Sequence, residues 1–176
     1  YVAFGSEYQA LVGLPKIEGA HVWEPGLQQY IFGNIKMPKF DLQKHDLRSL
    51  NRVLQDQKKE TKEISWEVIN PKGSHAIAVG IDAPIEVIIS GSTGYYCGGM
   101  NQHANITVKG SVGPGVAENM MSGKVVIEGD ASQYAGATGQ GGLLVIKGNA
   151  SSRCGISMKG INLSLIHISE PTRLTR

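Results

Sequence analysis

The sequence has few cysteines, few aromatic residues and no long hydrophobic run. Only two of its 176 residues are cysteines, which excludes a disulfide scaffold and predicts a reducing, cytoplasmic environment. No apolar run reaches the roughly 18 residues that a membrane helix needs. The 17 basic and 15 acidic residues leave a net charge of +2, so we expect neither nucleic acid nor a membrane surface as a partner.

Glycine is abundant and unevenly distributed. The chain has 23 glycines, of which 16 fall within residues 85–160 and only seven within residues 1–84. This difference in composition predicts that the two halves of the chain have different architectures.

A repeat of 19 residues runs through the glycine-rich half. Four β-branched runs each end in glycine, and these glycines are 19 residues apart: Gly91, Gly110, Gly129 and Gly148. No segment between them has a helical period long enough for a helix. Stacked coils of a parallel β-helix fit this pattern, with about 4.8 Å between neighbouring strands. Because 19 is not a multiple of six, we predict a right-handed β-helix rather than a left-handed hexapeptide helix.

The positions of the repeat agree from coil to coil. Two apolar columns are expected to face the interior: 87, 106, 125 and 144, and 89, 108, 127 and 146. A polar ladder should face outward, with charges of alternating sign: Ser90, Lys109, Glu128 and Lys147. Turn-forming residues follow each glycine: Ser92, Ser111, Asp130 and Asn149. The next column holds mostly small residues, which fit a corner of the coil: Thr93, Val112, Ala131 and Ala150. We expect the glycines to supply positive φ or a close approach of two backbones.

Residues that could carry chemistry are sparse. Cys97 and Cys154 share one column, but three coils would separate their Cα atoms by about 14 Å, beyond disulfide reach. We therefore predict buried, unreactive thiols. The histidines do not have metal-binding spacing, and the segment 136–142 has neither Walker nor dinucleotide-binding spacing. No aromatic or charged stripe marks a sugar-binding face. We predict no catalytic, metal-binding or cofactor-binding residue in this chain.

The first half of the chain predicts smaller elements. A short helix near 5–13 and strands near 20–24 and 28–33 are expected, forming a short N-terminal α/β appendage. Asp46 is a good N-cap for a helix that carries leucines at helical spacing. The charged run 56–63 is interpreted as the solvated end of this helix or as a linker. The segments 66–69 and 76–79 are predicted to be strands of a first irregular coil or cap.

The C-terminal segment has an unusual origin in this interpretation. Leu163–Arg173 is the translation of a string that resembles a transposase adapter used to prepare sequencing libraries. We therefore assign no function to His167, Glu170 or Arg173. The expected division is 1–36 as an appendage, 37–65 as helix and linker, 66–162 as a truncated β-helix and 163–176 as adapter-derived.

Four segments between residues 66 and 160 together resemble a known family: Trp66–Gly80, Gly94–Gln102, Val116–Gly123 and Cys154–Gly160. They are similar to the glutamate synthase C-terminal, glycine-motif (GXGXG) β-helix domain in its stand-alone form. That form is a small subunit of glutamate-synthase-like complexes, including N-methylglutamate synthase. Residues 1–33 are similar to the closing segment of a class II glutamine amidotransferase. A fusion and a lost stop codon before Met37 would explain this arrangement equally well.

The resemblance implies a non-catalytic, architectural subunit. In such complexes an amidotransferase uses an N-terminal cysteine to hydrolyse glutamine, and a separate barrel subunit with FMN and an iron–sulfur cluster makes the amino acid. Those two subunits are the expected partners, and this chain is expected to hold no cofactor. Two alternatives remain: a β-helix subunit of a formylmethanofuran dehydrogenase-like redox complex, and an independent ligand-binding solenoid.

Overall fold

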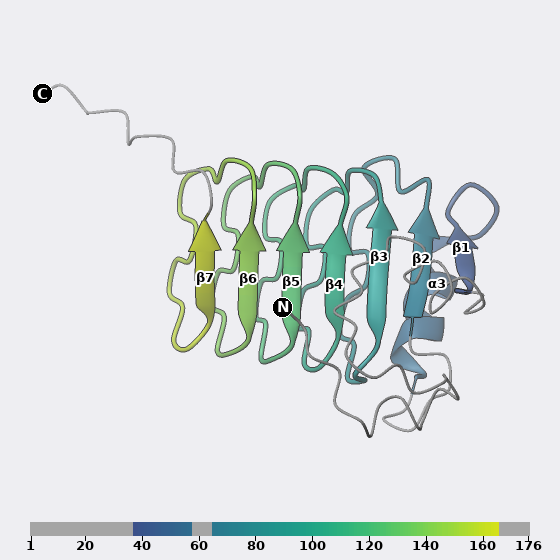
Figure 1. Cartoon of the computed structure of the whole chain (residues 1–176), viewed down its shortest axis with the longest axis horizontal. Helices are drawn as coiled ribbons and strands as arrows, with labels where there is room; N and C mark the ends of the chain where they lie inside the picture. Colours follow the sequence, from purple (N-terminus) through teal and green to yellow (C-terminus); the bar gives the residue numbers. More distant parts are fainter. Residues whose placement is uncertain (1–36, 58–64, 166–176) are drawn as a thin grey trace, which may run out of the picture. The chain divides into compact units, whose positions relative to one another are not determined.

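Seven parallel strands stacked in chain order form the body of the molecule (Figure 1). The computed structural model describes residues 37–57 and 65–165. The strands are β1 (Lys39–Asp41), β2 (Ser65–Ile69), β3 (Glu86–Ser90), β4 (Asn105–Val108), β5 (Lys124–Ile127), β6 (Leu143–Ile146) and β7 (Asn162–Leu165). One helix, α3 (Leu47–Gln55), lies between β1 and β2 in the described sequence. The chain is therefore mainly β, with a parallel β-solenoid.

The register of the strands confirms the predicted repeat. From β3 onward each residue pairs with the residue 19 positions later, as in Glu86 with Asn105 and Lys124 with Leu143. A second column of parallel bridges joins the same coils at Thr93, Val112, Ala131 and Ala150. The first coils are longer, because Ser65 pairs with Glu86 and Lys39 pairs with Glu67. The regular 19-residue coil thus begins at β3.

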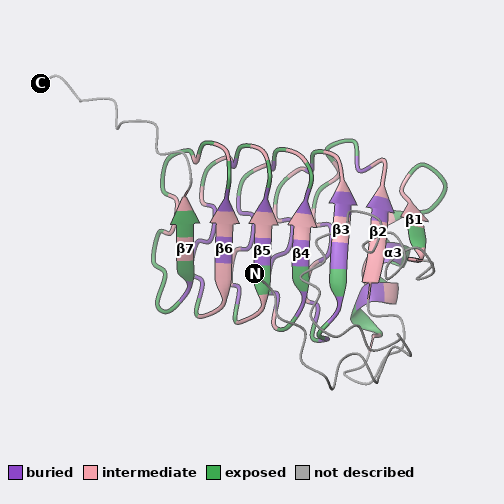
Figure 2. Ribbon diagram, in the orientation of Figure 1, coloured by how far each residue is buried: buried purple, intermediate pink, exposed green. Residues whose placement is uncertain are grey.

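The two predicted interior columns form the core. All eight of their side chains are buried: Val87, Ile89, Ile106, Val108, Val125, Ile127, Leu144 and Ile146. Figure 2 shows the same alternation of buried and more exposed positions along β3 to β6. Because successive side chains of a strand point to opposite faces, one column of each strand always faces inward. Burial of these apolar columns is the main favourable term that holds the coils together.

The return segment of each coil is a turn in which every second residue has positive φ. In the coil after β3 these residues are Tyr96, Gly98 and Met100, with φ of 60°, 64° and 53°. The same triplet recurs at 76, 78 and 80, at 115, 117 and 119, at 134, 136 and 138, and at 153, 155 and 157. The prediction of a strand over 76–79 is therefore wrong. Alternating left-handed residues bend the chain into a turn, which a β-strand cannot contain.

Three of the four glycines that close the coils are explained by crowding against the backbone of the preceding coil: Gly110, Gly129 and Gly148. Of the four, only Gly91 has positive φ. A Cβ on Gly110 would lie 2.6 Å from the carbonyl carbon of Gly91 and 2.7 Å from the backbone nitrogen of Ser92. A Cβ on Gly129 would similarly lie 2.8 Å from the carbonyl carbon of Gly110. Glycine is needed here because neighbouring coils approach too closely for any side chain.

Helix α3 confirms the predicted helix and closes one end of the solenoid. Asp46 caps it by accepting a hydrogen bond from the Ser49 N–H at 3.1 Å, and Leu50 and Leu54 are fully buried. The Asn51 side chain donates to the carbonyl of Ala76 at 2.8 Å and accepts from the N–H of Val79 at 3.4 Å. Gln55 donates to the carbonyl of Val79. Gln55 therefore bonds to the Val79 carbonyl as a preceding coil would, since Gly80 donates to the equivalent carbonyl of Gly99.

Strands β1 and β7 lie in segments for which the sequence predicted no strand. β1 pairs with β2 in a region for which only a helix and a linker were predicted. β7 contains Leu163 and Leu165, which pair with Leu144 and Ile146 of β6. The adapter-like string thus encodes an apolar alternation that continues the inward columns for one strand.

Several predictions lie outside the described residues. These are the helix near 5–13, the strands near 20–24 and 28–33, most of the charged run 56–63, and His167, Glu170 and Arg173.

Candidate partner-binding surface

The two cysteines are free thiols, and neither has the environment of a nucleophile. Cys97 is fully buried, and burial raises its pKa to about 12. Cys154 is half-buried, and burial raises its pKa as well. A nucleophilic cysteine needs a stabilised thiolate, so neither residue fits that role.

The histidines of the described region make separate pairs. His45 lies against the Phe40 ring, and His75 stacks on Tyr95 with ring centroids 4.2 Å apart. His103 pairs with Asp82, with 2.7 Å between Nδ1 and Oδ1, and both side chains are about half exposed. Among residues 37–57 and 65–165, no group of three or more His, Cys, Asp or Glu side chains could hold a metal ion. His21 lies outside these residues.

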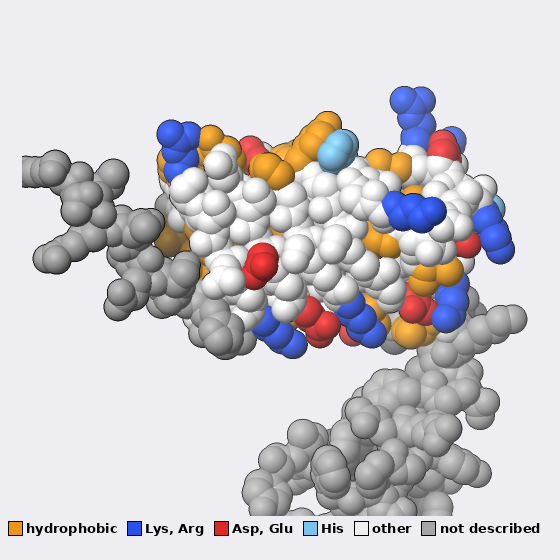
Figure 3. Space-filling view, turned by 90° about the horizontal axis from the view of Figure 1, so that it is seen from above, with side chains coloured by type: hydrophobic (Ala, Val, Ile, Leu, Met, Phe, Trp, Pro, Cys, Tyr) orange, Lys and Arg blue, Asp and Glu red, His pale blue; other side chains and the backbone are white. Residues whose placement is uncertain are grey.

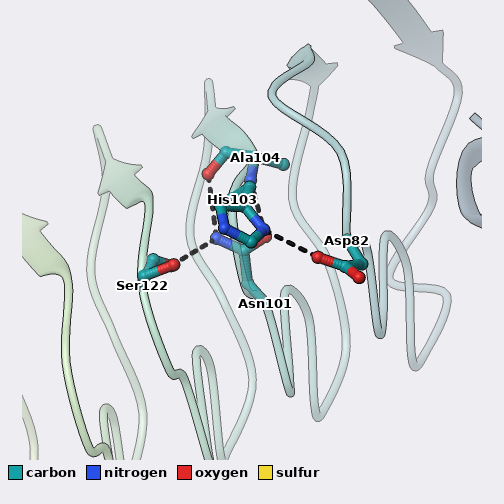
Figure 4. Close-up of polar contacts among 5 residues, drawn as sticks. All are labelled: Asp82, Asn101, His103, Ala104 and Ser122. Carbon is teal, nitrogen blue, oxygen red and sulfur yellow. Dashed lines mark hydrogen bonds and ion pairs between the residues drawn. The ribbon is translucent and has the colours of Figure 1, made fainter. Parts of the chain in front are cut away.

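Asn101 organises the corner beside His103 (Figure 4). Its side chain is fully buried. It donates to the carbonyls of Ala104 and Ser122, at 2.8 and 3.1 Å, and accepts from the Ala104 N–H at 3.2 Å. These bonds close the corner and join it to the next coil. The arrangement satisfies buried backbone groups, which gives Asn101 a structural role.

The outward ladders stabilise the stack of coils. Lys147 pairs with Glu128 at 3.5 Å, but both side chains are half exposed, so the contribution to stability is small. The column of turn-forming residues has more hydrogen bonds between coils. The Ser92 side chain accepts a hydrogen bond from the Ser111 N–H, and the Asp130 side chain accepts one from the Asn149 N–H. This side of the solenoid is covered by small polar groups that bond to one another.

The outer face of the sheet carries one well-connected acidic group and one shallow hollow. Glu67 pairs with Lys39 at 2.8 Å and accepts from the Ser90 hydroxyl at 3.2 Å. The pKa of Glu67 lies below its usual value. The hydrogen bond from Lys39 lowers this pKa most, the hydrogen bond from Ser90 lowers it further, and burial acts in the opposite direction. The hollow is lined by Glu86, Asn105, Ile106, Thr107, Lys124 and Val126.

Aromatic and apolar side chains gather instead on the returning turns. We call this surface the turn face and define it by His75, Tyr95, Tyr96, Met100, Tyr134 and Arg153. Figure 3, viewed from above, shows hydrophobic side chains and one histidine along one long edge of the solenoid. Tyr95 and Met100 are among the exposed large hydrophobic residues.

Hydrogen bonds between coils fix the side chains of the turn face. The Tyr96 hydroxyl accepts from the Asn119 amide at 3.3 Å, and the Asn119 carbonyl oxygen accepts from the Thr138 hydroxyl at 2.6 Å. Arg153 donates to the Tyr134 hydroxyl at 2.6 Å, and its guanidinium lies 5.5 Å from the centre of that ring. The Tyr96 and Tyr134 rings are thus held in place by bonds between coils.

Four large side chains of the turn face occupy strained backbone positions, and one of them is Arg153, with φ of 59°. Tyr96, Tyr134 and Met100 have φ of 60°, 62° and 53°, whereas the residue equivalent to the tyrosines in the coil between them is Gly115. A left-handed conformation costs an ordinary residue about 1 kcal/mol or more relative to glycine. The same conformation recurs at the equivalent positions of the other turns, so the coiled fold imposes it on these side chains.

Sequence reasoning missed the turn face. Tyr96 and Tyr134 share one column of the 19-residue repeat two coils apart, so a search for aromatic columns would have found them. The stacking of His75 on Tyr95 spans the irregular 20-residue step between coils, and the regular repeat does not predict it.

No helix in the described part of the chain is both long and apolar enough to cross a membrane.

Comparison with known proteins gives two relatives from one organism. The chain is similar to Protein GlxC of Rhizobium meliloti (strain 1021), with 67% identity over 87 residues, which are 49% of this chain and 38% of GlxC. It is also similar to the Glutamine amidotransferase-like protein GlxB of the same strain, with 76% identity over 25 residues, which are 14% of this chain and 8% of GlxB.

No family model matches the chain, and no solved structure matches it. The chain spans less than half the length of either relative. It therefore combines a long stretch similar to Protein GlxC with a short stretch similar to a protein named as glutamine amidotransferase-like.

Proposed function

We propose that this chain is a non-catalytic, architectural β-helix subunit of a glutamate-synthase-like complex that is coupled to a glutamine amidotransferase. The observation that carries the proposal is the pair of relatives, because one chain matches both Protein GlxC and an amidotransferase-like protein. The buried thiol of Cys97 and the separated histidine pairs support a non-catalytic role for the described residues.

The turn face is the contact surface for the amidotransferase partner in this proposal. Tyrosine, methionine and arginine are enriched in protein interfaces, whereas lysine, glutamate, aspartate and serine are depleted. The turn face has the favoured residues, while the outer sheet face carries lysines and glutamates and the turn-former column carries small polar groups. Tyr95 and Met100 are the expected anchors, because both are exposed.

The FMN and the iron–sulfur cluster implied by the family resemblance belong to a separate barrel subunit in this proposal. Iron–sulfur clusters are usually held by four cysteine thiolates, and this chain has two cysteines in all. One of them, Cys97, is fully buried with a raised pKa, so the residues of this chain do not fit the cluster.

Co-purification tests the proposal. We expect the tagged 176-residue chain, co-expressed with an amidotransferase-like subunit and an FMN-containing barrel subunit, to retain both. The double variant Y95S/M100S should lose the amidotransferase-like subunit, whereas Lys109→Ser on the outer sheet face should retain it. Glutaminase activity in the isolated chain, or equal retention of the subunit by both variants, would contradict the proposal.

A further inference from the structure

A carboxylate lies where one column of the turn face lacks a side chain. This column holds Tyr96, Gly115, Tyr134 and Arg153 in successive coils. A Cβ on Gly115 would lie 2.6 Å from Oε2 of Glu118 and 3.7 Å from Cδ2 of Tyr96. The Glu118 carboxylate and the Tyr96 ring therefore lie close together, over a glycine that leaves room for both.

Glu118 departs from the repeat and has no partner of its own. Its equivalents in the neighbouring coils are Gly99 and Ala137, and its side chain is half-buried. Among residues 37–57 and 65–165, only the Glu118 carboxylate lacks both a hydrogen bond and an ion pair. The other acidic side chains of these residues each have one: Asp41, Asp46, Asp56, Glu67, Asp82, Glu86, Glu128 and Asp130. Glu118 lies in the middle of the stack, with coils on both sides, so its surroundings do not depend on the ends of the chain.

The same column shows how a guanidinium binds to this surface. Arg153 donates to the Tyr134 hydroxyl at 2.6 Å and lies 5.5 Å from the centre of that ring. It is two coils from Glu118, which is about 10 Å along the stack, and it is already bonded to its tyrosine. Within the described residues no cation lies over the Tyr96 ring, whose hydroxyl accepts from Asn119. Tyr96 and Glu118 together thus present an aromatic ring and a negative charge without a cation.

Docking of a partner on the turn face would remove water from Glu118. An unpaired carboxylate that is buried in an interface opposes binding, unless the partner supplies a positive charge. We propose that Glu118 binds an arginine side chain of the amidotransferase-like subunit, with the guanidinium lying on the Tyr96 ring. Arginine fits better than lysine, because a planar guanidinium stacks on a ring and donates two hydrogen bonds to a carboxylate at once. This inference rests on the proposed function and adds the chemistry by which the partner is recognised.

Titration of the amidotransferase-like subunit onto the tagged 176-residue chain, with the barrel subunit present, tests the proposal. Glu118→Gln keeps the size of the side chain and removes its charge, so the dissociation constant should rise about tenfold or more. Glu128→Gln is the matched control and should leave the constant unchanged, because Glu128 is a half-exposed glutamate that pairs with Lys147 on the outer sheet face. Added salt should weaken binding of the unaltered chain more than binding of Glu118→Gln.

Exchange of the two charges identifies the arginine. Glu118→Arg should abolish detectable binding, and replacing one surface arginine of the amidotransferase-like subunit with glutamate should restore it. A misfolded variant would not be rescued in this way, so restored binding separates recognition from folding.

Three outcomes would overturn this inference and leave the proposed function intact. They are an unchanged dissociation constant for Glu118→Gln, rescue of Glu118→Arg by a lysine position alone, and no rescue by any single basic position when the circular dichroism of Glu118→Arg matches that of the unaltered chain. Failure of the unaltered chain to bind the amidotransferase-like subunit would overturn both.

Discussion

The Asn51 side-chain amide lies 2.8 Å from the carbonyl oxygen of Ala76, to which it donates a hydrogen bond. In the regular coils the equivalent carbonyl accepts from an N–H of its own turn, as when Gly99 donates to Tyr96 at 3.4 Å. Asn51 thus bridges the Ala76 carbonyl and the Val79 N–H, whose equivalents in the regular coils bond to each other within the turn.

Replacing this side chain should destabilise the fold. Asn51→Leu keeps a helix-forming residue but leaves the Ala76 carbonyl and the Val79 N–H without their partner, which should cost about 1–3 kcal/mol. Arg52→Ala is the control, since Arg52 forms an exposed pair with Asp56 and should change stability by less than about 0.5 kcal/mol. Urea unfolding measures both variants, and an equal effect of the two would contradict this role for Asn51.

Gly110→Ala should be strongly destabilising for a different reason. Its Cβ would lie 2.6 Å from the carbonyl carbon of Gly91, and that backbone cannot move without separating two coils. A loss of about 1–3 kcal/mol is expected from overpacking. Thermal unfolding checks this against Lys109→Ala, an exposed neighbour expected to be nearly neutral. Similar unfolding temperatures for the two variants would show that the coils can separate at little cost.

Substitutions at two of the three exposed methionines of the described residues separate the effect of backbone strain from that of losing a side chain. Met100 is 41% exposed with φ of 53°, and Met121 is 45% exposed with no positive φ. Met100→Gly should stabilise the fold by up to about 1 kcal/mol, because glycine adopts the left-handed region without a Cβ penalty. Met121→Gly should destabilise it by about 0.5–1 kcal/mol through backbone entropy. Changes of the same sign in chemical denaturation would refute the explanation by strain.

Glu67 should make stability depend on acid pH. Its folded pKa lies below the ordinary 4.5, first because of the hydrogen bond from Lys39. A depressed carboxyl pKa contributes stability that is fully present above the unfolded pKa and is lost as pH falls through the folded pKa. The free energy of unfolding should therefore fall less steeply from pH 5 toward acid in Glu67→Gln than in the unaltered chain. Parallel pH profiles would exclude this contribution.

The two thiols should differ in reactivity. With a pKa of about 12, Cys97 has about one thiolate in ten thousand molecules at pH 8, and it is buried as well. A disulfide reagent should therefore modify Cys154 in the folded chain and reach Cys97 only after unfolding. Cys154→Ala, in which only the buried thiol remains, should show almost no reaction without denaturant. A fast reaction of that variant in the folded state would contradict the described burial.

The 19-residue period of the sequence is sufficient to predict the architecture. Glycines 19 residues apart and apolar residues at alternate positions specify stacked parallel strands, because register and inward-facing columns follow from local spacing alone. The helix after Asp46 was equally predictable, since an N-cap and a helical period are local signals.

Tertiary structure decided the rest. Four features depend on residues that are 19 or more positions apart in the sequence. They are the need for glycine at position 110, the bond from Asn51 to Ala76, the pairing of β1 with β2 and the hydrogen bond between Tyr96 and Asn119. Positive φ at Tyr96 and Tyr134 also contradicts the local preference of tyrosine, and the neighbouring coils impose it. Contacts across coils outweigh local preference at these positions, so the sequence determined the repeat and the assembled coils determined its surface.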